Sequence, residues 1–500
     1  MKLDKALKDF KDLQAKQCAF DHALSLLQFD GVTTAPKGTA ENRARTASVL
    51  SEELYKLSTG NKTVNLLEYL ESRKNELTDK ERRTISLVLK DIRKMQRIPI
   101  NEYVAYEKMI IESDDIWHTA KERNDFSMFL PYLEKIFDYT RRFATYCSPD
   151  KNPYDYCIDQ YSEGLDMNQC DTFFAALKGR IVPLLHKISE KDQLSDDCIR
   201  GHFKASAQKR FALELMDIIG LDKNHCGLAE TEHPFTTTLG SHYDVRITTN
   251  YYTENVSYSM YSVMHEGGHA LYELGSDKDL AYTYLDGASS MSIHESQSRF
   301  YENLLGRSRE FTDFIFPKMR RIFNSHMKRF TADDLYRAVN LVTPSLIRTE
   351  ADEVTYCLHI MVRYDLEKQV MSGELQVKDL PDEWNKQYKL YLGIDVPDDR
   401  HGILQDSHWS GGLIGYFPSY ALGSAYGAHF IQKMNESFDV ASCLKKGDFR
   451  MINEWNNAKI WKYGSYLSPS EILDNVLGEP FDPFVYTDYL ENKYTELYEL

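Results

Sequence analysis

Helical spacing dominates this chain of 500 residues and restricts the folds that are open to it. Apolar residues recur at intervals of three and four over long segments, and only 25 Gly and 15 Pro are present to interrupt them. This spacing predicts amphipathic α-helices, and we find no alternation of strands and helices that would indicate a parallel sheet. We therefore expect a mainly α protein.

Several local signals refine this expectation. Three helix starts are predicted by capping boxes, in which a Ser or Thr is followed three residues later by an acid: Thr78 with Glu81, Thr331 with Asp334, and Ser468 with Glu471. Residues 235–252 differ, because they are rich in Thr, Tyr and β-branched residues around a central Gly-Ser, which predicts a hairpin or small antiparallel sheet. No linker or repeat divides the chain, so residues 1–500 are predicted to form one domain with two lobes flanking a cleft.

Composition excludes several classes of protein. With 42% apolar and 27% charged residues the chain is not disordered, and a net charge of -16 argues against nucleic acid or an anionic membrane as partner. The eight cysteines are scattered without a CxxC pair, which fits a reducing compartment. The N-terminus lacks an apolar signal core, and the most apolar stretch, 413–431, contains Pro418, His429 and glycines. We therefore expect a cytoplasmic protein without a membrane span.

The strongest chemical motif is H-E-x-x-H, formed by His265, Glu266, Gly267, Gly268 and His269. On a helix the two histidines lie one turn apart on one face, where both can bind the same ion. Glu266 can then reach a water held by that ion, which is the arrangement that a metallohydrolase needs. Two adjacent glycines cost about 1 kcal/mol each in a helix relative to Ala, which indicates that another element approaches this helix closely.

A catalytic zinc requires a third protein ligand and one open position. Glu295, in the downstream sequence His-Glu-Ser-Gln-Ser, is the candidate, and its neighbours His294, Gln297 and Ser298 could supply hydrogen bonds around it. Taken alone, a Glu is more often a surface residue, and two histidines on a helix can also be unrelated.

These two motifs resemble those of the Taq-type metallocarboxypeptidase family. Four further motifs of that family occur in order: residues 233–235 match H-P-F, 244–248 match D-x-R-x-T, 347–352 match I-R-x-x-A-D, and 402–409 match G-x-x-Q-D-x-H-W. The similarity extends from Phe29 to the C-terminal region. Phe29 itself replaces a common Trp at a position that looks structural, and residues 161–164 have Y-S-E-G where the family has Y-E-P-G, which can alter a loop.

The resemblance implies a large helical metallopeptidase fold with a deep cleft, a small sheet near the active site and one divalent metal per chain. It also implies homodimers and the removal of single residues from peptide C-termini with broad specificity. The implied metal ligands are His265, His269 and Glu295. Zn²⁺ is the expected ion, and Co²⁺ also suits two imidazoles and a carboxylate.

Chemistry assigns roles to further residues. Glu266 is expected to act as general base and then as general acid. A second donor to the oxyanion is expected from Tyr420 and His408, with Tyr416 as the alternative, because this stretch is similar to that of related cleft-type oligopeptidases. Ordinary core packing explains such aromatic residues equally well.

An exopeptidase must also bind the terminal carboxylate of its substrate, and a guanidinium does so with two hydrogen bonds. Arg348 is the first candidate, although a salt bridge to Asp352 would explain it too. Arg246 is the competitor, and its alternative role is that of an outward strand residue. His233 could contact the substrate, close the cleft or cap the structure. An exposed edge of the hairpin could pair with the peptide backbone, which would tolerate varied side chains.

Two other functions use the same features. A metallo-endopeptidase could share the helical cleft fold, but it would be indifferent to amidation of the peptide C-terminus. A non-catalytic helical binding protein could keep a structural metal, but such sites normally have four protein ligands and have no use for Glu266.

Overall fold

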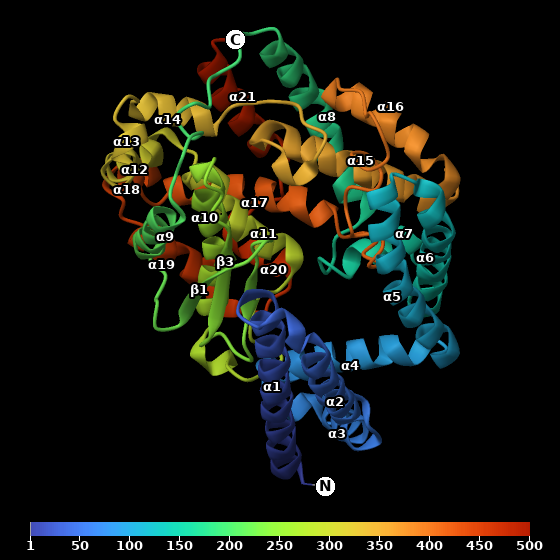
Figure 1. The fold of residues 1–500 in the computed structure, drawn as a ribbon. Coiled ribbons are helices and arrows are strands. Elements are labelled where there is room, and N and C mark those ends of the chain that lie inside the picture. Colours follow the sequence, from blue (N-terminus) through green and yellow to red (C-terminus); the bar gives the residue numbers. More distant parts are fainter. Residues whose placement is uncertain (1) are drawn as a thin grey trace.

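The computed structural model describes residues 2–500 and confirms the mainly α prediction (Figure 1). The first half contains α1 (Leu3–Thr33), α2 (Ala40–Thr59), α3 (Asn61–Ser72), α4 (Asp79–Arg97), α5 (Ile100–Arg123), α6 (Phe126–Cys147), α7 (Pro153–Asp159), α8 (Met167–Ser189), α9 (Ala205–Ile219) and α10 (Val256–Leu274). The second half contains α11 (Met291–Arg299), α12 (Arg309–Ile322), α13 (Asn324–Met327), α14 (Ala332–Val339), α15 (Glu353–Ser372), α16 (Leu380–Leu392), α17 (Pro418–Asn435), α18 (Val440–Lys446), α19 (Arg450–Lys459), α20 (Pro469–Leu477) and α21 (Phe484–Tyr498).

The predicted helix starts are confirmed. Thr78, Thr331 and Ser468 are the N-caps of α4, α14 and α20, and each forms the reciprocal hydrogen bonds of a capping box. These bonds satisfy backbone N–H groups that a helix N-terminus otherwise leaves free. The apolar stretch 413–431 contributes most of α17, which is buried inside the protein. Within residues 2–500, no helix combines the length and apolar character needed to cross a bilayer.

The sheet differs from the prediction in one respect. Strands β2 (Thr236–Thr238) and β3 (Val245–Thr249) form the expected antiparallel hairpin, with Thr236 opposite Ile247. A third strand, β1 (Cys226–Glu230), pairs in parallel with β3, so the sheet is mixed rather than purely antiparallel, in the order β1-β3-β2. The sequence of β1, Cys-Gly-Leu-Ala-Glu, lacks β-branched and aromatic residues, and its pairing comes from the tertiary structure rather than from strand propensity.

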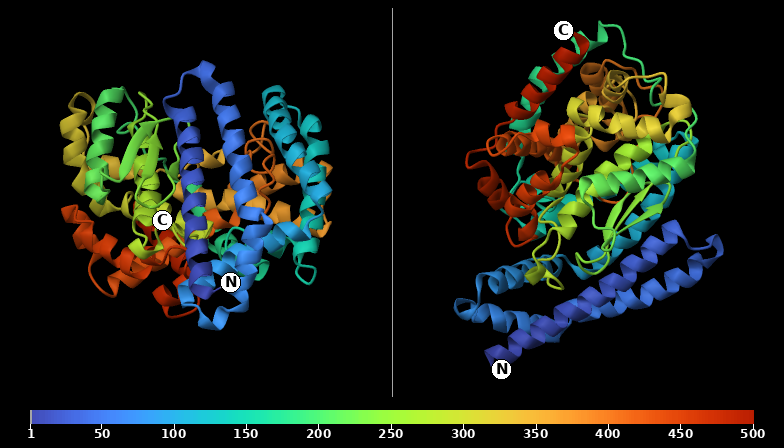
Figure 2. Two further views of the ribbon diagram at one scale, coloured as in Figure 1. Left: turned by 90° about the horizontal axis from the view of Figure 1, so that it is seen from below. Right: turned by 90° about the vertical axis from the view of Figure 1, so that its left-hand side faces the viewer.

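Two separate clusters of buried apolar side chains stabilise the fold. The large cluster includes residues from α5 through α21, and a small one joins α1, α3 and α4 through residues such as Phe10, Leu67 and Leu89. Figures 1 and 2 show the N-terminal helices as a separate layer beside the sheet and the rest of the helices. The predicted division into two lobes around a cleft remains a prediction.

Candidate metal centre and active site

Helix α10 carries the H-E-x-x-H motif. Asn255 caps its N-terminus by accepting a hydrogen bond from the backbone N–H of Ser257, and the helix is buried over most of its length. His265 and His269 lie one turn apart, with ring centroids separated by 4.9 Å. Glu266 is only 6% exposed, and its Oε2 accepts a hydrogen bond of 2.7 Å from Thr236 of β2. The hairpin therefore fixes the carboxylate that the sequence predicts to be the base.

Helix α11 brings Glu295 to the two histidines. Its Oε2 lies 3.8 Å from Nε2 of His265 and 3.5 Å from Nε2 of His269, and the three ligand atoms all lie within 4.8 Å of one another. Ligand bonds of about 2.1 Å in a tetrahedral site place ligand atoms about 3.4 Å apart. The three residues therefore fit a divalent metal with one position left open.

Close helix contacts set this geometry. A Cβ at Gly268 would lie 2.5 Å from the carbonyl oxygen of Gln297 in α11, and a Cβ at Gly423 of α17 would lie 2.8 Å from Cγ of Glu295. A Cβ at Gly267 would meet Cδ1 of Ile219 at 2.5 Å. The close approach predicted from the paired glycines is therefore confirmed, and at Gly268 the approaching element is the backbone of the helix that carries the third ligand.

A ring of charged side chains surrounds the ligands. Glu302 lies in the π-helical turn that follows α11 (Phe300–Leu305), and its Oε2 accepts a hydrogen bond of 2.8 Å from Nδ1 of His265, which leaves Nε2 for a metal. Arg299 donates to the other oxygen of Glu295 at 2.7 Å. Of the predicted neighbours, Ser298 does hydrogen-bond to Glu295 at 3.0 Å, whereas Gln297 instead accepts from Trp461.

The electrostatics suit metal binding and base catalysis. Burial raises the pKa of Glu266, against the opposing effects of His265 and Thr236. Burial would also raise the pKa of Glu295, but the charges of Arg299 and His265 outweigh it and lower that pKa. Burial and neighbouring His294 lower the pKa of His269 to about 3, so its imidazole is neutral and can offer a lone pair at neutral pH.

A second cluster contains Arg348, His408, Tyr416 and Tyr420. Nε2 of His408 lies 3.1 Å from the Tyr420 hydroxyl, the rings of Tyr416 and Tyr420 are 5.0 Å apart, and the Arg348 guanidinium lies 5.1 Å from the Tyr420 ring. Arg348 does not pair with Asp352, which instead caps α15. Burial and the charge of Arg348 lower the pKa of His408 to about 4, so this imidazole is neutral.

Asp406 fixes Arg348. Its Oδ1 accepts hydrogen bonds from Nε and Nη2 of Arg348 at 3.0 and 2.7 Å, and its Oδ2 accepts from Nε of Arg363 at 2.7 Å. Tyr356 and Tyr420 connect this cluster to the ligands, because the charges of both Arg348 and Glu295 act on the hydroxyl of each. Burial is nevertheless the main reason that the pKa of each phenol is raised.

His233 and Arg246 belong to neither cluster. Arg246 pairs with Asp244 at 2.6 Å, and it lies on the sheet face opposite α10, since Thr249 on the alternate face hydrogen-bonds to Ser262 of α10. His233 is exposed in the loop before β2. Phe29, the departure from the family pattern, packs edge-on against Phe235 at 6.2 Å.

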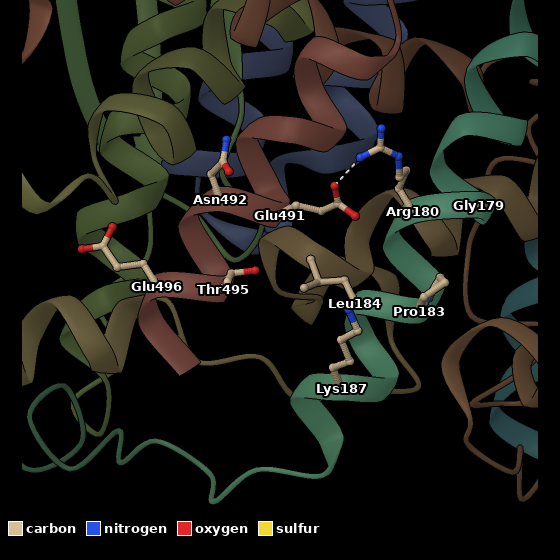
Figure 3. A pocket seen from close by; sticks show the side chains of 9 residues that line it. All are labelled: Gly179, Arg180, Pro183, Leu184, Lys187, Glu491, Asn492, Thr495 and Glu496. Carbon is tan, nitrogen blue, oxygen red and sulfur yellow. Dashed lines mark hydrogen bonds and ion pairs between the residues drawn. The ribbon is translucent and has the colours of Figure 1, made fainter. Parts of the chain in front are cut away.

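A surface hollow between α8 and α21 lies elsewhere (Figure 3). Its lining includes Leu184, Thr495 and the ion pair of Arg180 with Glu491, but none of the predicted site residues. This hollow is not part of the candidate active site.

The fold and the two clusters define a helical metallohydrolase, and comparison with known proteins identifies its family. The family model described as Carboxypeptidase Taq (M32) metallopeptidase matches residues 9–494. Carboxypeptidase 1 of Bacillus subtilis is 38% identical over 495 residues, with 99% of each chain covered. Thermostable carboxypeptidase 1 of Thermus thermophilus is 36% identical over 489 residues, with 95% of each chain covered.

Solved structures agree with this assignment. The crystal structure of an M32 carboxypeptidase from Deinococcus radiodurans superimposes with a TM-score of 0.96 at 34% identity, covering 99% of this chain and 100% of that one. The chain therefore belongs to the Carboxypeptidase Taq (M32) family. It is a metallocarboxypeptidase, and its family implies a divalent metal.

Proposed function

We propose that this enzyme removes single C-terminal residues from peptides with varied side chains, with Zn²⁺ held by His265, His269 and Glu295. The observation that carries the proposal is the meeting of three ligand atoms within 4.8 Å, beside the buried carboxylate of Glu266. A bound divalent ion supplies Lewis acidity, which lowers the pKa of a water and polarises the scissile carbonyl.

Glu266 moves the protons of the reaction. Its carboxylate accepts a proton from the attacking water and later gives one to the amine that leaves. The hydrogen bond from Thr236 orients this carboxylate, and burial raises its pKa, which makes it a stronger base than an exposed Glu. Four ligands would be expected in a structural site, and Glu266 would have no role there.

Arg348 binds the terminal carboxylate of the peptide. Asp406 carries one negative charge against the two positive charges of Arg348 and Arg363, so one positive charge remains for a ligand. Nη1 of Arg348 has no acceptor among residues 2–500, whereas all three guanidinium nitrogens of Arg363 are hydrogen-bonded. Arg246 is the weaker candidate because its guanidinium already pairs with Asp244.

Tyr420 and His408 stabilise the developing oxyanion. The hydroxyl of Tyr420 is a neutral donor, and the hydrogen bond to His408 orients it. Tyr416 is the alternative donor, since its ring lies 5.0 Å from that of Tyr420. His233 would contact the peptide or close one end of its binding groove.

The edge strand β2 pairs with the peptide backbone. It is the outer strand of the sheet and is tied to α10 by Thr236, so a peptide lying along it would pass the metal ligands. Recognition through backbone hydrogen bonds makes few demands on side chains, which accounts for broad specificity.

Mass spectrometry of matched peptides with free and amidated C-termini tests the proposal. The metal-loaded enzyme should shorten the free peptides one residue at a time and leave the amidated ones intact. Chelator should stop the reaction and added Zn²⁺ should restore it. Internal cleavage of both peptide sets at equal rates would instead indicate a metallo-endopeptidase.

Two variants test the residue roles. Glu266→Gln should retain metal but lose most turnover, and normal turnover would overturn its assignment as the base. Arg348→Ala should weaken the preference for free over amidated peptides, whereas an unchanged preference would shift the role to Arg246.

We further propose that the enzyme acts as a homodimer in the cytoplasm and does not bind nucleic acid. All eight cysteines are unpaired, as expected in a reducing compartment, and the net charge of -16 disfavours nucleic acid. Sedimentation analysis tests the dimer, because a monomer at micromolar concentration would refute it.

A further inference from the structure

Helix α15 presents polar side chains along one face although it is buried almost completely. His359, Arg363 and Glu367 are each 0% exposed and are spaced by four residues, so they lie on the same face of the helix. Arg363 holds Gln405 and Asp406. Glu367, one turn further along, holds the next part of the same segment.

The carboxylate of Glu367 accepts three hydrogen bonds. Its Oε1 accepts from the indole N–H of Trp409 at 2.7 Å, and its Oε2 accepts from the backbone N–H of Gly415 at 2.9 Å and from the Tyr154 hydroxyl at 2.8 Å. No Lys or Arg forms an ion pair with Glu367 anywhere in residues 2–500. The carboxylate therefore acts as an acceptor for fixed donors and not as the partner of a cation.

The two partners in this segment directly adjoin predicted active-site residues. Trp409 follows His408, and Gly415 precedes Tyr416. Gly415 has a φ of +89°, and a Cβ there would lie 2.7 Å from the backbone of Cys157 in α7, so its backbone has little freedom to move. Glu367 thus secures both ends of the turn that separates His408 from Tyr416.

We propose that Glu367 is a positioning residue for peptide hydrolysis, which fixes His408 and Tyr416, and through them Tyr420, by holding Trp409 and Gly415. This inference rests on the proposed function of those three residues. It assigns a role to Trp409 of the G-x-x-Q-D-x-H-W motif, to which the chemistry of the site gave none.

A carboxylate is required because the indole and the backbone amide are obligate donors that bind different oxygens. The amide of a Gln at this position would turn an NH₂ group toward one of the two, whichever way it was oriented. Burial also raises the pKa of Glu367 to about 7, so an ionised acid is costly here. Its presence without an ion pair indicates that the acceptor geometry is needed.

A double-mutant cycle tests the proposal. Glu367→Gln and Trp409→Phe should each lower kcat about ten- to hundredfold, because small displacements of catalytic groups are that costly. KM and the bound metal should stay unchanged. The double variant should be no slower than Glu367→Gln, because both changes break the same hydrogen bond. Trp409→Phe keeps a ring between Phe137 and Trp384, so it provides the test even if Glu367→Gln folds poorly.

Tyr154→Phe is the matched control. It removes a hydrogen bond from the same carboxylate but leaves both bonds to the segment, so kcat should stay within about threefold of wild type. Wild-type kcat in Glu367→Gln and Trp409→Phe, or fully multiplicative losses in the double variant, would overturn the inference. A wild-type enzyme that releases no C-terminal residue would refute the proposed function and this inference with it, whereas an active wild type matched by Glu367→Gln refutes only the inference.

Discussion

Gly268 allows the crossing of α10 and α11 that brings the third ligand to the two histidines. In Gly268→Ala the new methyl group would lie 2.5 Å from the carbonyl oxygen of Gln297, whereas ordinary contact begins at 3.4 Å. The helices would therefore have to separate by about 0.9 Å, which is the difference between these distances. Metal–ligand distances tolerate deviations of only about 0.2 Å, so Glu295 could no longer share an ion with both histidines.

Two opposing effects set the stability of this variant. Ala is favoured over Gly by about 1 kcal/mol within a helix, while overpacking of a core typically costs about 1–3 kcal/mol. We expect a small net change in unfolding temperature but at least about tenfold weaker Zn²⁺ binding, equivalent to about 1.4 kcal/mol. Competition with a chromophoric chelator measures the affinity, and thermal unfolding of the metal-free protein measures the stability.

Gly267→Ala is the matched control because it gives the same helix gain one residue away. Its methyl group would meet Cδ1 of Ile219, the tip of a side chain that can rotate, and not the backbone of a ligand helix. Zn²⁺ affinity in this variant should equal that of wild type. The explanation would be refuted if Gly268→Ala bound Zn²⁺ as tightly as wild type, or if both variants lost affinity equally.

Three further predictions concern groups around the site. Glu302→Gln should weaken Zn²⁺ binding about 10- to 100-fold, because the hydrogen bond that orients His265 is weakened; unchanged affinity in a chelator competition would reject this role. Thr236→Val should lower kcat about fivefold with metal content unchanged, since Glu266 loses a hydrogen bond worth about 1 kcal/mol; full activity would contradict it. Burial raises the pKa of Glu367 from 4.5 to about 7 on folding, so its protonation stabilises the fold below pH 4.5 and that stability is lost as the pH rises through 7. Relative to Glu367→Gln, the wild type should therefore lose about 2 kcal/mol more between pH 5 and pH 7, and parallel urea-unfolding curves of the two proteins would exclude this.

Features encoded by short-range sequence patterns were predictable. The capping box at Thr78 depends on residues three positions apart, and the pairing of His265 with His269 depends on helical periodicity alone. Glu295 could be singled out because a catalytic metal needs a third ligand, and its place beside the histidines agrees with the structure.

Features that depend on distant partners could not be predicted in this way. Strand β1 has no strand propensity and exists because β3 lies next to it. Arg363 and Glu367 look in the sequence like members of a solvated helix face, yet both are fully buried because Asp406, Trp409 and Gly415 supply their partners from beyond the helix. Pairing over more than 40 residues leaves no local pattern, and only family motifs pointed to Asp406 and Trp409.

The metal ligands and the predicted oxyanion donor are placed by one stack of three helices. Helix α11 lies between α10 and α17, and it touches each of them where a Gly removes the side chain, at Gly268 and at Gly423. Tyr420 precedes Gly423 by three residues and so lies one turn away on the same face of α17, toward Glu295. A change that shifts α11 therefore alters the distance from Glu295 to the histidines and its distance to Tyr420 together. Because both spacings depend on backbone contacts, substitution of either Gly should disturb the site more than the loss of any single hydrogen bond around it.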